Sequence, residues 1–389
     1  MRRISEDLER QTLAPYASLA ADSRGRRYPD APDEYRTDFQ RDRDRIIYST
    51  AFRRLQYKTQ VYVVHEGDAY RTRLTHTLEV MQHARTLARV LRVNEDLTEA
   101  IALAHDLGHA PFGHGGEEEL NLLLATEGGF EHNRQSLRLV DLLERRYPAF
   151  PGLNLTYETR EGLARHSTVY DQPDLPDEFA HTPYPGLECQ IVNVADQLAF
   201  CAHDLDDALR SGLLSLQALC EAGLALPAAV LAAIEIKEPV ELRRRLLVRG
   251  LIDRLTRAVL RETKRRLEES GVDSPAAVRR HRETMVGLPR EEAAELAALN
   301  AFLYREVYKH PSVMVMAAKG QAVLRELFHR FLDEPRLLPR STQARLAEGT
   351  DSPARVIGDY LAGMTDRHAV LVYQKMIDPG TPVGHGLGE

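Results

Sequence analysis

The chain has 389 residues, a formal net charge of −7 and three cysteines. Its length permits a large buried core. The composition, with 43% hydrophobic and 28% charged residues, excludes a disordered or fibrous protein. No run of about eighteen apolar residues occurs, so no membrane-spanning helix is expected. The start MRRISEDLER lacks the apolar stretch of a secretory signal. We therefore expect a soluble, cytoplasmic protein.

The cysteines and the charge balance exclude further classes. Cys189, Cys201 and Cys220 are odd in number and show no CxxC spacing. This pattern disfavours a disulfide framework or a thiolate zinc site and favours a reducing compartment. The acidic balance argues against a general nucleic-acid-binding protein. The basic runs LRRRLLVRG and ETKRRLEE predict solvated helix faces, with a nucleic-acid patch as the less favoured alternative.

In most of the N-terminal half of the chain, apolar residues recur with the period of an α-helix. Residues 22–38 are polar and turn-rich and predict an arm, and a strand is expected only at 60–64. Apolar residues recur every three or four positions in 74–91 and 97–107, which is typical of amphipathic helices. Asn94 is the expected N-cap of the second helix, and Gly108 with Pro111 gives its stop.

The same periodicity continues to the C-terminus. Residues 167–187 carry four prolines and predict a long loop, and the final DPGTPVGHGLGE predicts a frayed tail. The helical pattern predicts an all-α protein, with helices in the following stretches: 191–209, 241–268, 292–309, 321–332 and 355–376.

Histidine is concentrated in one part of the chain. Six of the fifteen histidines lie between positions 76 and 132, where an even distribution would place about two. Imidazole and carboxylate groups together serve divalent-metal and phosphate chemistry, and histidine also acts as a general acid or base near neutral pH. The six are His76, His83, His105, His109, His114 and His132.

The run from His105 to Glu117 holds most of the expected chemistry. His105 and Asp106 end an apolar helix, and alone they are more typical of a buried hydrogen-bonded pair than of a metal site. The Gly- and Pro-rich stretch that follows lets the backbone approach a ligand closely. If a helix restarts there, His114 and Glu117 share one of its faces.

Two other segments supply candidate partners. Arg73 lies three residues before His76, on the same face of the helix predicted over 74–91. Asp196 lies among Val192, Ala195 and Ala199, where a carboxylate is unfavourable unless it is paired or binds a cation. Asp204 lies two turns later and, taken alone, is typical of a surface carboxylate.

These segments resemble the HD-domain superfamily of metal-dependent phosphohydrolases, and within it the deoxynucleoside triphosphate triphosphohydrolases, the dGTPase-like family. The resemblance covers about residues 35–375, and AHDLGHAPFGHGGE at 104–117 is its most specific run. The runs that follow the family's order are RDRDRIIYSTAFRRLQYKTQV (41–61), RTRLTHTLEV (71–80), FEHNRQSLRLV (130–140), LTYETREGLARHS (155–167), ADQLAFCAHDLDDAL (195–209), FLYREVYKHPSV (302–313) and DYLAGMTDRHAV (359–370).

The resemblance implies an HD-domain helical core with additional C-terminal helices. We expect an N-terminal arm over 1–40, the phosphohydrolase core over 41–215, a C-terminal helical region packed on it over 216–376, and a flexible tail over 377–389. The family commonly has Tyr where this chain has Phe200, so a hydroxyl contact to substrate is expected to be missing. Asp366 and Arg367, in the run MTDRH, are expected to pair structurally.

The resemblance also implies a set of site residues. One divalent cation would be held by His76, His105, Asp106 and Asp196, a sulfur-free set that suits Mn, Mg, Co, Ni or Fe. His114 and Glu117 would form the catalytic pair. The implied substrate-binding residues are Gln60, Arg73, His109, His132 and Asp204.

The implied reaction is hydrolysis of a dNTP to the deoxynucleoside and inorganic triphosphate, by attack of water at the α-phosphorus. In this scheme His114 is the general acid at the 5′-oxygen and Glu117 orients it, although the roles of acid and nucleophile activator could be exchanged. The alternatives are an HD-type phosphodiesterase or 5′-nucleotidase acting on another nucleotide, and a non-catalytic nucleotide-binding regulator. The family also implies a homo-oligomer and, more weakly, activation by a second dNTP or binding of single-stranded DNA.

Overall fold

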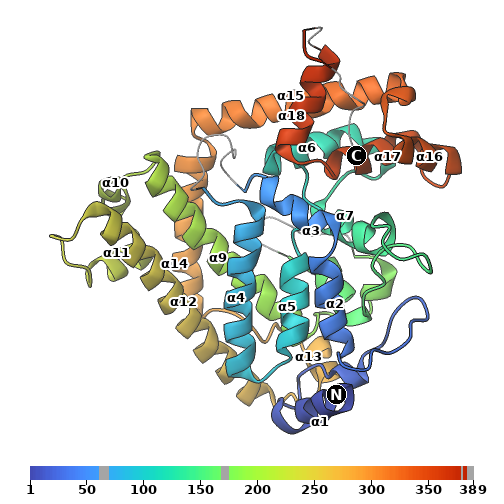
Figure 1. Cartoon of the computed structure of the whole chain (residues 1–389). Coiled ribbons are helices and arrows are strands. Elements are labelled where there is room, and N and C mark those ends of the chain that lie inside the picture. The colour runs from blue at the N-terminus through green and yellow to red at the C-terminus, as the bar shows by residue number, and fades with distance from the viewer. Residues whose placement is uncertain (61–69, 168–174, 378–379, 383–389) are drawn as a thin grey trace.

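The computed structural model describes residues 1–60, 70–167, 175–377 and 380–382, and within these ranges the chain is all-α (Figure 1). No strand occurs among them, only isolated β-bridges such as that between Arg26 and Thr156. The first nine helices are α1 (Arg2–Thr12), α2 (Asp38–Ile47), α3 (Thr50–Arg54), α4 (Arg73–Leu91), α5 (Glu95–Ala104), α6 (Gly113–Leu123), α7 (His132–Arg138), α8 (Tyr157–Ala164) and α9 (Leu187–Ser211). The later ones are α10 (Leu216–Glu221), α11 (Ala225–Leu231), α12 (Val240–Ser270), α13 (Pro275–Arg280), α14 (Arg290–Leu303), α15 (Pro311–Asp333), α16 (Arg340–Glu348), α17 (Pro353–Ala362) and α18 (Asp366–Ile377).

The predicted helices are confirmed, but several bounds differ: the helix expected over 321–332 begins at Pro311, and the stretch 292–309 is α14 followed by a π-helical turn over Tyr304–Tyr308. Asn94 caps α5 as expected, because its side-chain oxygen accepts a hydrogen bond from the Leu97 amide at 3.1 Å. The α5 helix ends at Ala104, so His105 and Asp106 lie in the turn beyond it. The stretch 355–376 is two helices instead of one. Gly363 ends α17, and the Thr365 hydroxyl accepts a hydrogen bond from the His368 amide at the start of α18.

The core is built around α4, α5 and α9, which pack on one another at the centre of the molecule (Figure 1). The largest hydrophobic cluster joins their apolar faces to α12 and α14, with Leu87, Ile101, Leu198 and Leu255 all fully buried. Burying such side chains contributes about 1.5–3 kcal/mol each. The apolar stripes therefore hold together the three helices that border the His-rich run.

A second cluster lies at the opposite side of the His-rich run. It packs α6 against α15, α17 and α18, with Leu120, Leu324 and Leu361 fully buried. Figure 1 shows these helices together at one end of the molecule, with α12 and α14 along another side. The C-terminal helices thus contact the elements around the run at two places, while the segment boundaries at 40, 215 and 376 stay predictions.

The N-terminal arm is attached to the core by ion pairs. Arg26 pairs with Asp42 of α2 at 2.5 Å, and both side chains are buried. Asp30 pairs with Arg45 of the same helix and with Arg41 at 2.7 Å. Because charged groups are buried at low cost only when they are paired, these pairs fix the polar, turn-rich stretch against α2.

Some predictions fall outside the described residues. These are most of the expected strand at 60–64, residues 168–174 of the long loop and most of the tail. All three cysteines are free thiols, as expected; Cys189 and Cys201 are buried, whereas Cys220 is exposed. Among the described helices, none combines the length and apolar character needed to cross a bilayer.

Gly108 permits the closest approach between the His-rich run and α7. A Cβ at this position would collide with backbone atoms of His132 and Ser136, and the Gly108 amide donates to the Ser136 hydroxyl at 2.8 Å. We therefore expect Gly108→Ala to lower the free energy of unfolding by about 2–3 kcal/mol or more, because overpacking against backbone cannot relax by a rotamer change. Urea denaturation measures this.

Gly363→Ala is the matched control. Its φ of −73° suits any residue, and the nearest side-chain atom to an added Cβ is Nη1 of Arg54 at 3.3 Å. Its free energy of unfolding should stay within about 1 kcal/mol of the wild type. Equal stability of the two variants would show that the packing at Gly108 is looser than described.

Candidate active site

Four chain segments converge on the His-rich run. Arg73 and His76 lie in the first turn of α4, and Asp196 lies in the middle of α9. The turn after α5 carries His105, Asp106 and His109. A helix does restart at Gly113, as expected, because Phe112 takes a left-handed conformation (φ 65°) that redirects the chain into α6. Helix α6 carries His114 and Glu117.

Three of the four predicted metal ligands form a buried cluster. Side-chain nitrogen and oxygen atoms of His76, His105 and Asp196 all lie within 4.8 Å of one another. His76 Nε2 is 2.9 Å and His105 Nε2 is 3.8 Å from Oδ1 of Asp196. Two imidazoles and a carboxylate suit a first-row divalent cation or magnesium better than a thiolate-type zinc site.

His105 is oriented as a cation ligand should be. Its Nδ1 is 2.7 Å from the Ala102 carbonyl oxygen, which can only accept, so Nδ1 carries the hydrogen. Nε2 is then left with a lone pair; it is buried and has no hydrogen-bond partner among the described residues. Burial also lowers the pKa of His105, which favours the neutral ring that binds metals. The residues present therefore fit a divalent cation.

Asp106, the fourth predicted ligand, lies beside this cluster and faces three cationic or polar side chains. Its Oδ2 accepts from Nη1 of Arg73 at 2.9 Å, and its Oδ1 is 3.1 Å from His109 Nε2 and 3.5 Å from His105 Nε2. Burial alone would raise the pKa of Asp106, but the attraction of His105, Arg73 and His109 holds it well below its usual range. Arg73, predicted to bind phosphate, is thus held at the edge of the cluster.

Glu117 is directed to His132. Its carboxylate accepts from the His132 backbone amide at 2.9 Å and lies 3.0 Å from Nδ1 of the same ring. The rings of His132 and His109 stack with centroids 3.9 Å apart and an angle of 15° between their planes. Burial raises the pKa of Glu117, but the hydrogen bond and attraction of His132 outweigh it and lower the pKa far below its usual value. The Glu117 carboxylate therefore fixes His132, and the expectation that it orients His114 stays a prediction.

His114 is the exposed member of the histidine group. Its ring lies at an edge-to-face angle to His109, with centroids 6.4 Å apart, and 6.5 Å from the ring of Tyr308. A histidine in this position is accessible to a ligand and at the same time adjacent to the buried ring of His109. This placement suits proton transfer to a bound substrate.

Asp204 is buried two turns along α9 from Asp196, so the surface interpretation is wrong. Its Oδ2 accepts a hydrogen bond from the Tyr308 hydroxyl. Burial raises the pKa of Asp204 to about 7. Tyr308 also stacks on Phe200, with centroids 6.2 Å apart. A tyrosine hydroxyl is therefore present beside Phe200, supplied from the segment after α14.

Gln60 lies at the other side of the run and is buried, and its Oε1 has no partner among the described residues. The preceding residue, Thr59, donates through its amide to Asp366 at 2.9 Å, and Asp366 also accepts from the Phe112 amide at 2.9 Å. These bonds connect α18 to both borders of the site, and the expected pair with Arg367 is wrong, because the carboxylate of Asp366 bonds to Thr59 and Phe112 instead.

Lys58 is a buried cation that sequence reasoning missed. Its ammonium donates to the carbonyls of His109 and Ala362, the latter at 2.8 Å. Burial lowers the pKa of Lys58 to about 7. The surrounding pattern FRRLQYK gives no signal for this, since a lysine beside three basic or polar residues is typical of a solvated face.

Two further histidines were also missed. His166, at the end of the α8 segment, has Nε2 3.5 Å from Asp196 Oδ2, and its ring lies 5.1 Å from that of His105. His203 on α9 contacts both His76 and Glu79. Burial lowers the pKa of His203 to about 4. The run LARHS and the spacing of seven from Asp196 to His203, which places both on one face of α9, are the only signals the sequence offers.

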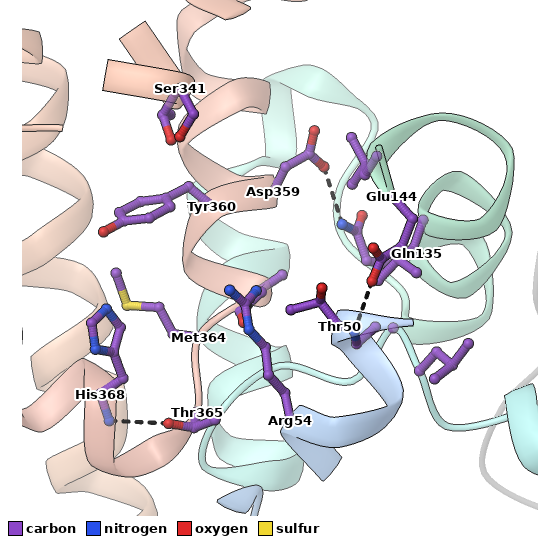
Figure 2. Close-up of a pocket in the computed structure, with 18 of the residues that line it drawn as sticks. Thr50, Arg54, Gln135, Glu144, Ser341, Asp359, Tyr360, Met364, Thr365 and His368 are labelled. Carbon is purple, nitrogen blue, oxygen red and sulfur yellow. Dashed lines mark hydrogen bonds between the residues drawn. The ribbon is translucent and has the colours of Figure 1, made fainter. Parts of the chain in front are cut away.

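A cavity of about 660 Å³ opens behind the run, between α3, α7 and α17. Figure 2 shows His368 at the left of it, Glu144 with Gln135 at the right, and Arg54 between them. Asp359 is neutralised there by Arg138 and Arg345, with closest approaches of 2.9 and 2.8 Å. Leu107, Gly108 and Lys58 line the cavity too, so it borders the back of the His-rich run.

Comparison with known families agrees with this arrangement. The family model of the HD domain matches residues 73–201, from Arg73 to the residues after Asp196. The model of a phosphohydrolase-associated domain matches residues 286–375, which include α14, α15 and most of α18. The two matches thus cover the site and the C-terminal helices that contact it.

Whole-chain comparison gives the family. A relative from Syntrophus aciditrophicus is 50% identical over 387 residues, covering 97% of both chains. Relatives from Bordetella pertussis and Thiobacillus denitrificans are 48% and 44% identical and cover 95% and 94% of this chain and 97% of their own. All three are named deoxyguanosinetriphosphate triphosphohydrolase-like protein. This chain is therefore a member of the deoxyguanosinetriphosphate triphosphohydrolase-like family of HD-domain proteins.

Proposed function

We propose that the protein hydrolyses deoxynucleoside triphosphates, dGTP or several dNTPs, to the deoxynucleoside and inorganic triphosphate. The observation that carries the proposal is the buried cluster of His76, His105 and Asp196 with Arg73 and His109 at its edge. A cation-binding cluster beside an arginine and histidines offers positive groups to a polyphosphate at several points at once. The names of the relatives point to the same substrate class.

The cluster would hold one divalent cation through His76, His105 and Asp196, with Asp106 as the fourth ligand. When bound, a divalent cation supplies polarisation of a phosphate oxygen and a site for water. We propose manganese or magnesium first, with cobalt, nickel or iron as the other candidates for this nitrogen and oxygen donor set.

The remaining residues bind and position the substrate in this proposal. Arg73 and His109, both bonded to Asp106, face the α-phosphate, and His132 is held in place by Glu117. His114 donates a proton to the departing 5′-oxygen, which leaves as the 5′-hydroxyl of the deoxynucleoside. Gln60 and Asp204 lie at the borders of the site and are proposed to contact the sugar and base.

Assembly and regulation remain predictions. We propose a homo-oligomer located in the cytoplasm. A second dNTP is proposed as an activator, and the cavity in Figure 2 is a candidate place for it, because Arg54 and Lys58 there have only backbone oxygens as closest partners in the described structure. Single-stranded DNA is proposed only as an additional ligand of the basic runs. Rates with one dNTP, measured with and without a second, test activation.

The phosphorus-containing product tests the proposed reaction. Incubation of the protein with each dNTP and Mn²⁺, followed by ³¹P NMR, should show inorganic triphosphate and no nucleotide monophosphate. Orthophosphate would instead indicate a phosphatase or nucleotidase, and pyrophosphate, released together with the nucleoside monophosphate, would indicate cleavage between the α- and β-phosphates. A protein that binds dNTP without any turnover would fit the regulator alternative.

Removal of the cation ligands should abolish turnover. Asp106→Ala and Asp196→Ala each delete a buried carboxylate of the cluster, and we expect turnover to fall below detection while dGTP is no longer bound productively. Chelation with EDTA should have the same effect on the wild type, and added Mn²⁺ should restore activity only there. Activity that survives both treatments would contradict a cation-dependent mechanism.

His114→Ala should lower kcat by about 10²–10⁴-fold with little change in dNTP affinity, since a general acid acts in the transition state. Steady-state kinetics together with equilibrium dNTP binding measure the two effects separately. His329→Ala, which changes an exposed histidine on α15, is the control and should leave kcat unchanged. A near-normal kcat for His114→Ala would remove this residue from the mechanism.

Asp204 should make stability depend on pH. Its pKa is about 7 in the folded protein, above that of an unfolded carboxyl, so the folded state retains a proton that the unfolded chain loses. The free energy of unfolding should therefore fall as pH rises from about 4 to 7, by at most about 4 kcal/mol from this group. Asp204→Asn should flatten this fall, measured as Tm against pH. Asp253→Asn, at an exposed site on α12, should follow the wild type; a wild-type slope in Asp204→Asn would contradict the assignment.

A further inference from the structure

A second histidine stands behind the cation cluster. His203 on α9 and His76 on α4 are both buried, and their Nδ1 atoms lie 3.4 Å apart within hydrogen-bond geometry. The two rings meet edge to face, with centroids 5.6 Å apart. The other ring nitrogen of His76, Nε2, points toward the cation cluster and lies 2.9 Å from Oδ1 of Asp196. His203 therefore contacts the ring of His76 at the atom that the cluster does not use.

Glu79 occupies the far side of His203. The Glu79 carboxylate lies 2.7 Å from His203 Nε2 and also accepts from Nε of Arg71 at 3.0 Å. Arg71 is fixed in turn, because its Nη1 pairs with Asp206 and Asp207 of α9 at 2.8 Å each. Glu79 stands three residues after His76 on the same helix, so the two side chains enclose His203 from one face of α4.

The hydrogen bonds settle which nitrogen carries each proton. A carboxylate only accepts, so Nε2 of His203 donates to Glu79. A neutral imidazole that donates from Nε2 accepts at Nδ1, and Nδ1 of His76 must therefore be the donor between the two rings. Nε2 of His76, 2.9 Å from Oδ1 of Asp196, then carries the lone pair that would bind the cation; without a cation between the two atoms, this nitrogen would need a proton of its own to contact the carboxylate. Metal-binding histidines are usually fixed by such a partner on their other nitrogen, and its loss typically weakens cation binding about 10- to 100-fold.

We propose that His203 and Glu79 are positioning residues of the cation site, forming a chain from Arg71 through Glu79 and His203 to His76 that fixes the tautomer and ring orientation of His76. The proposal rests on the cation site of the proposed function. It assigns a role to two residues that touch neither the cation cluster's ligand atoms nor the substrate side of the run.

Substitutions at His203 separate positioning from mere packing. In His203→Asn the amide stands near the position of Nδ1 and keeps an acceptor for His76, whereas in His203→Gln it stands near Nε2 and keeps only the contact to Glu79. His203→Leu fills a similar volume and keeps neither. Isothermal titration calorimetry of the full chain with Mn²⁺ should show affinity loss in the order Asn, Gln, Leu, with Leu weakened about 10- to 100-fold.

Glu79→Gln provides the second arm and Glu95→Gln its matched control. Both residues are glutamates that pair with arginines, but Glu95 lies at the start of α5 and pairs with Arg89 and Arg85. Glu79→Gln should weaken Mn²⁺ binding, and Glu95→Gln should bind as the wild type does. Thermal melts identify any variant that fails to fold, and the conclusion is then drawn from the folded members of the series.

Two results would overturn the proposal. One is a Mn²⁺ dissociation constant for folded His203→Leu within about twofold of the wild type. The other is equal binding by the Asn and Gln variants, since a purely structural role does not distinguish the two nitrogens. Failure of the cation site itself is a different outcome: the wild type and Asp196→Ala would then bind Mn²⁺ alike.

Discussion

Two carboxylates, Asp106 and Asp196, lie inside the helical core, and the rest of the site is arranged around them. A buried carboxylate is tolerated only with positive or hydrogen-bonding partners, and here Arg73 and His109 serve Asp106 while His76 and His166 serve Asp196. These partners come from three different segments: the first turn of α4, the turn after α5 and the residues just after α8. The packing of α4, α5, α8 and α9 and the charge compensation at the cluster therefore depend on each other.

The C-terminal helices complete this arrangement from outside the HD-domain match. Asp366 of α18 accepts hydrogen bonds from Thr59 and from Phe112, which flank the site on both sides. Lys58 connects the carbonyls of His109 and Ala362. Movement of α17 or α18 would therefore shift the backbone of the His-rich run. A ligand in the adjacent cavity would act on the same contacts, which gives the proposed regulation a physical route.

Much of this could be predicted from the sequence, because local signals are strong where the chain is periodic or capped. The apolar stripes predicted α4, α5 and α9, whereas the restart into α6 was only the condition under which His114 and Glu117 would share a helix face. The prediction of the ligand cluster depended on the family resemblance, because Asp196 is about 90 residues from His105 and only the fold brings the two together. Side-chain partners across helices were predicted least well, because they leave no periodic signal. The bonds of Glu117 to His132, and those of Asp366 to Thr59 and Phe112, were not expected. Lys58, His166 and His203 were missed for the same reason.

Two groups of residues in the described chain could hold a cation: His76, His105 and Asp196, and the group of His109, Glu117 and His132. The second group is less suited to bind a cation, because the rings of His109 and His132 stack in nearly parallel planes and their lone pairs do not converge on one point.

The most direct test is a crystal structure with Mn²⁺ and a non-hydrolysable dGTP analogue, with the metal located by anomalous scattering. The account predicts one peak in contact with His76, His105 and Asp196, and the α-phosphate beside Arg73 and His109. A peak between His109, Glu117 and His132 with the first group empty would contradict it.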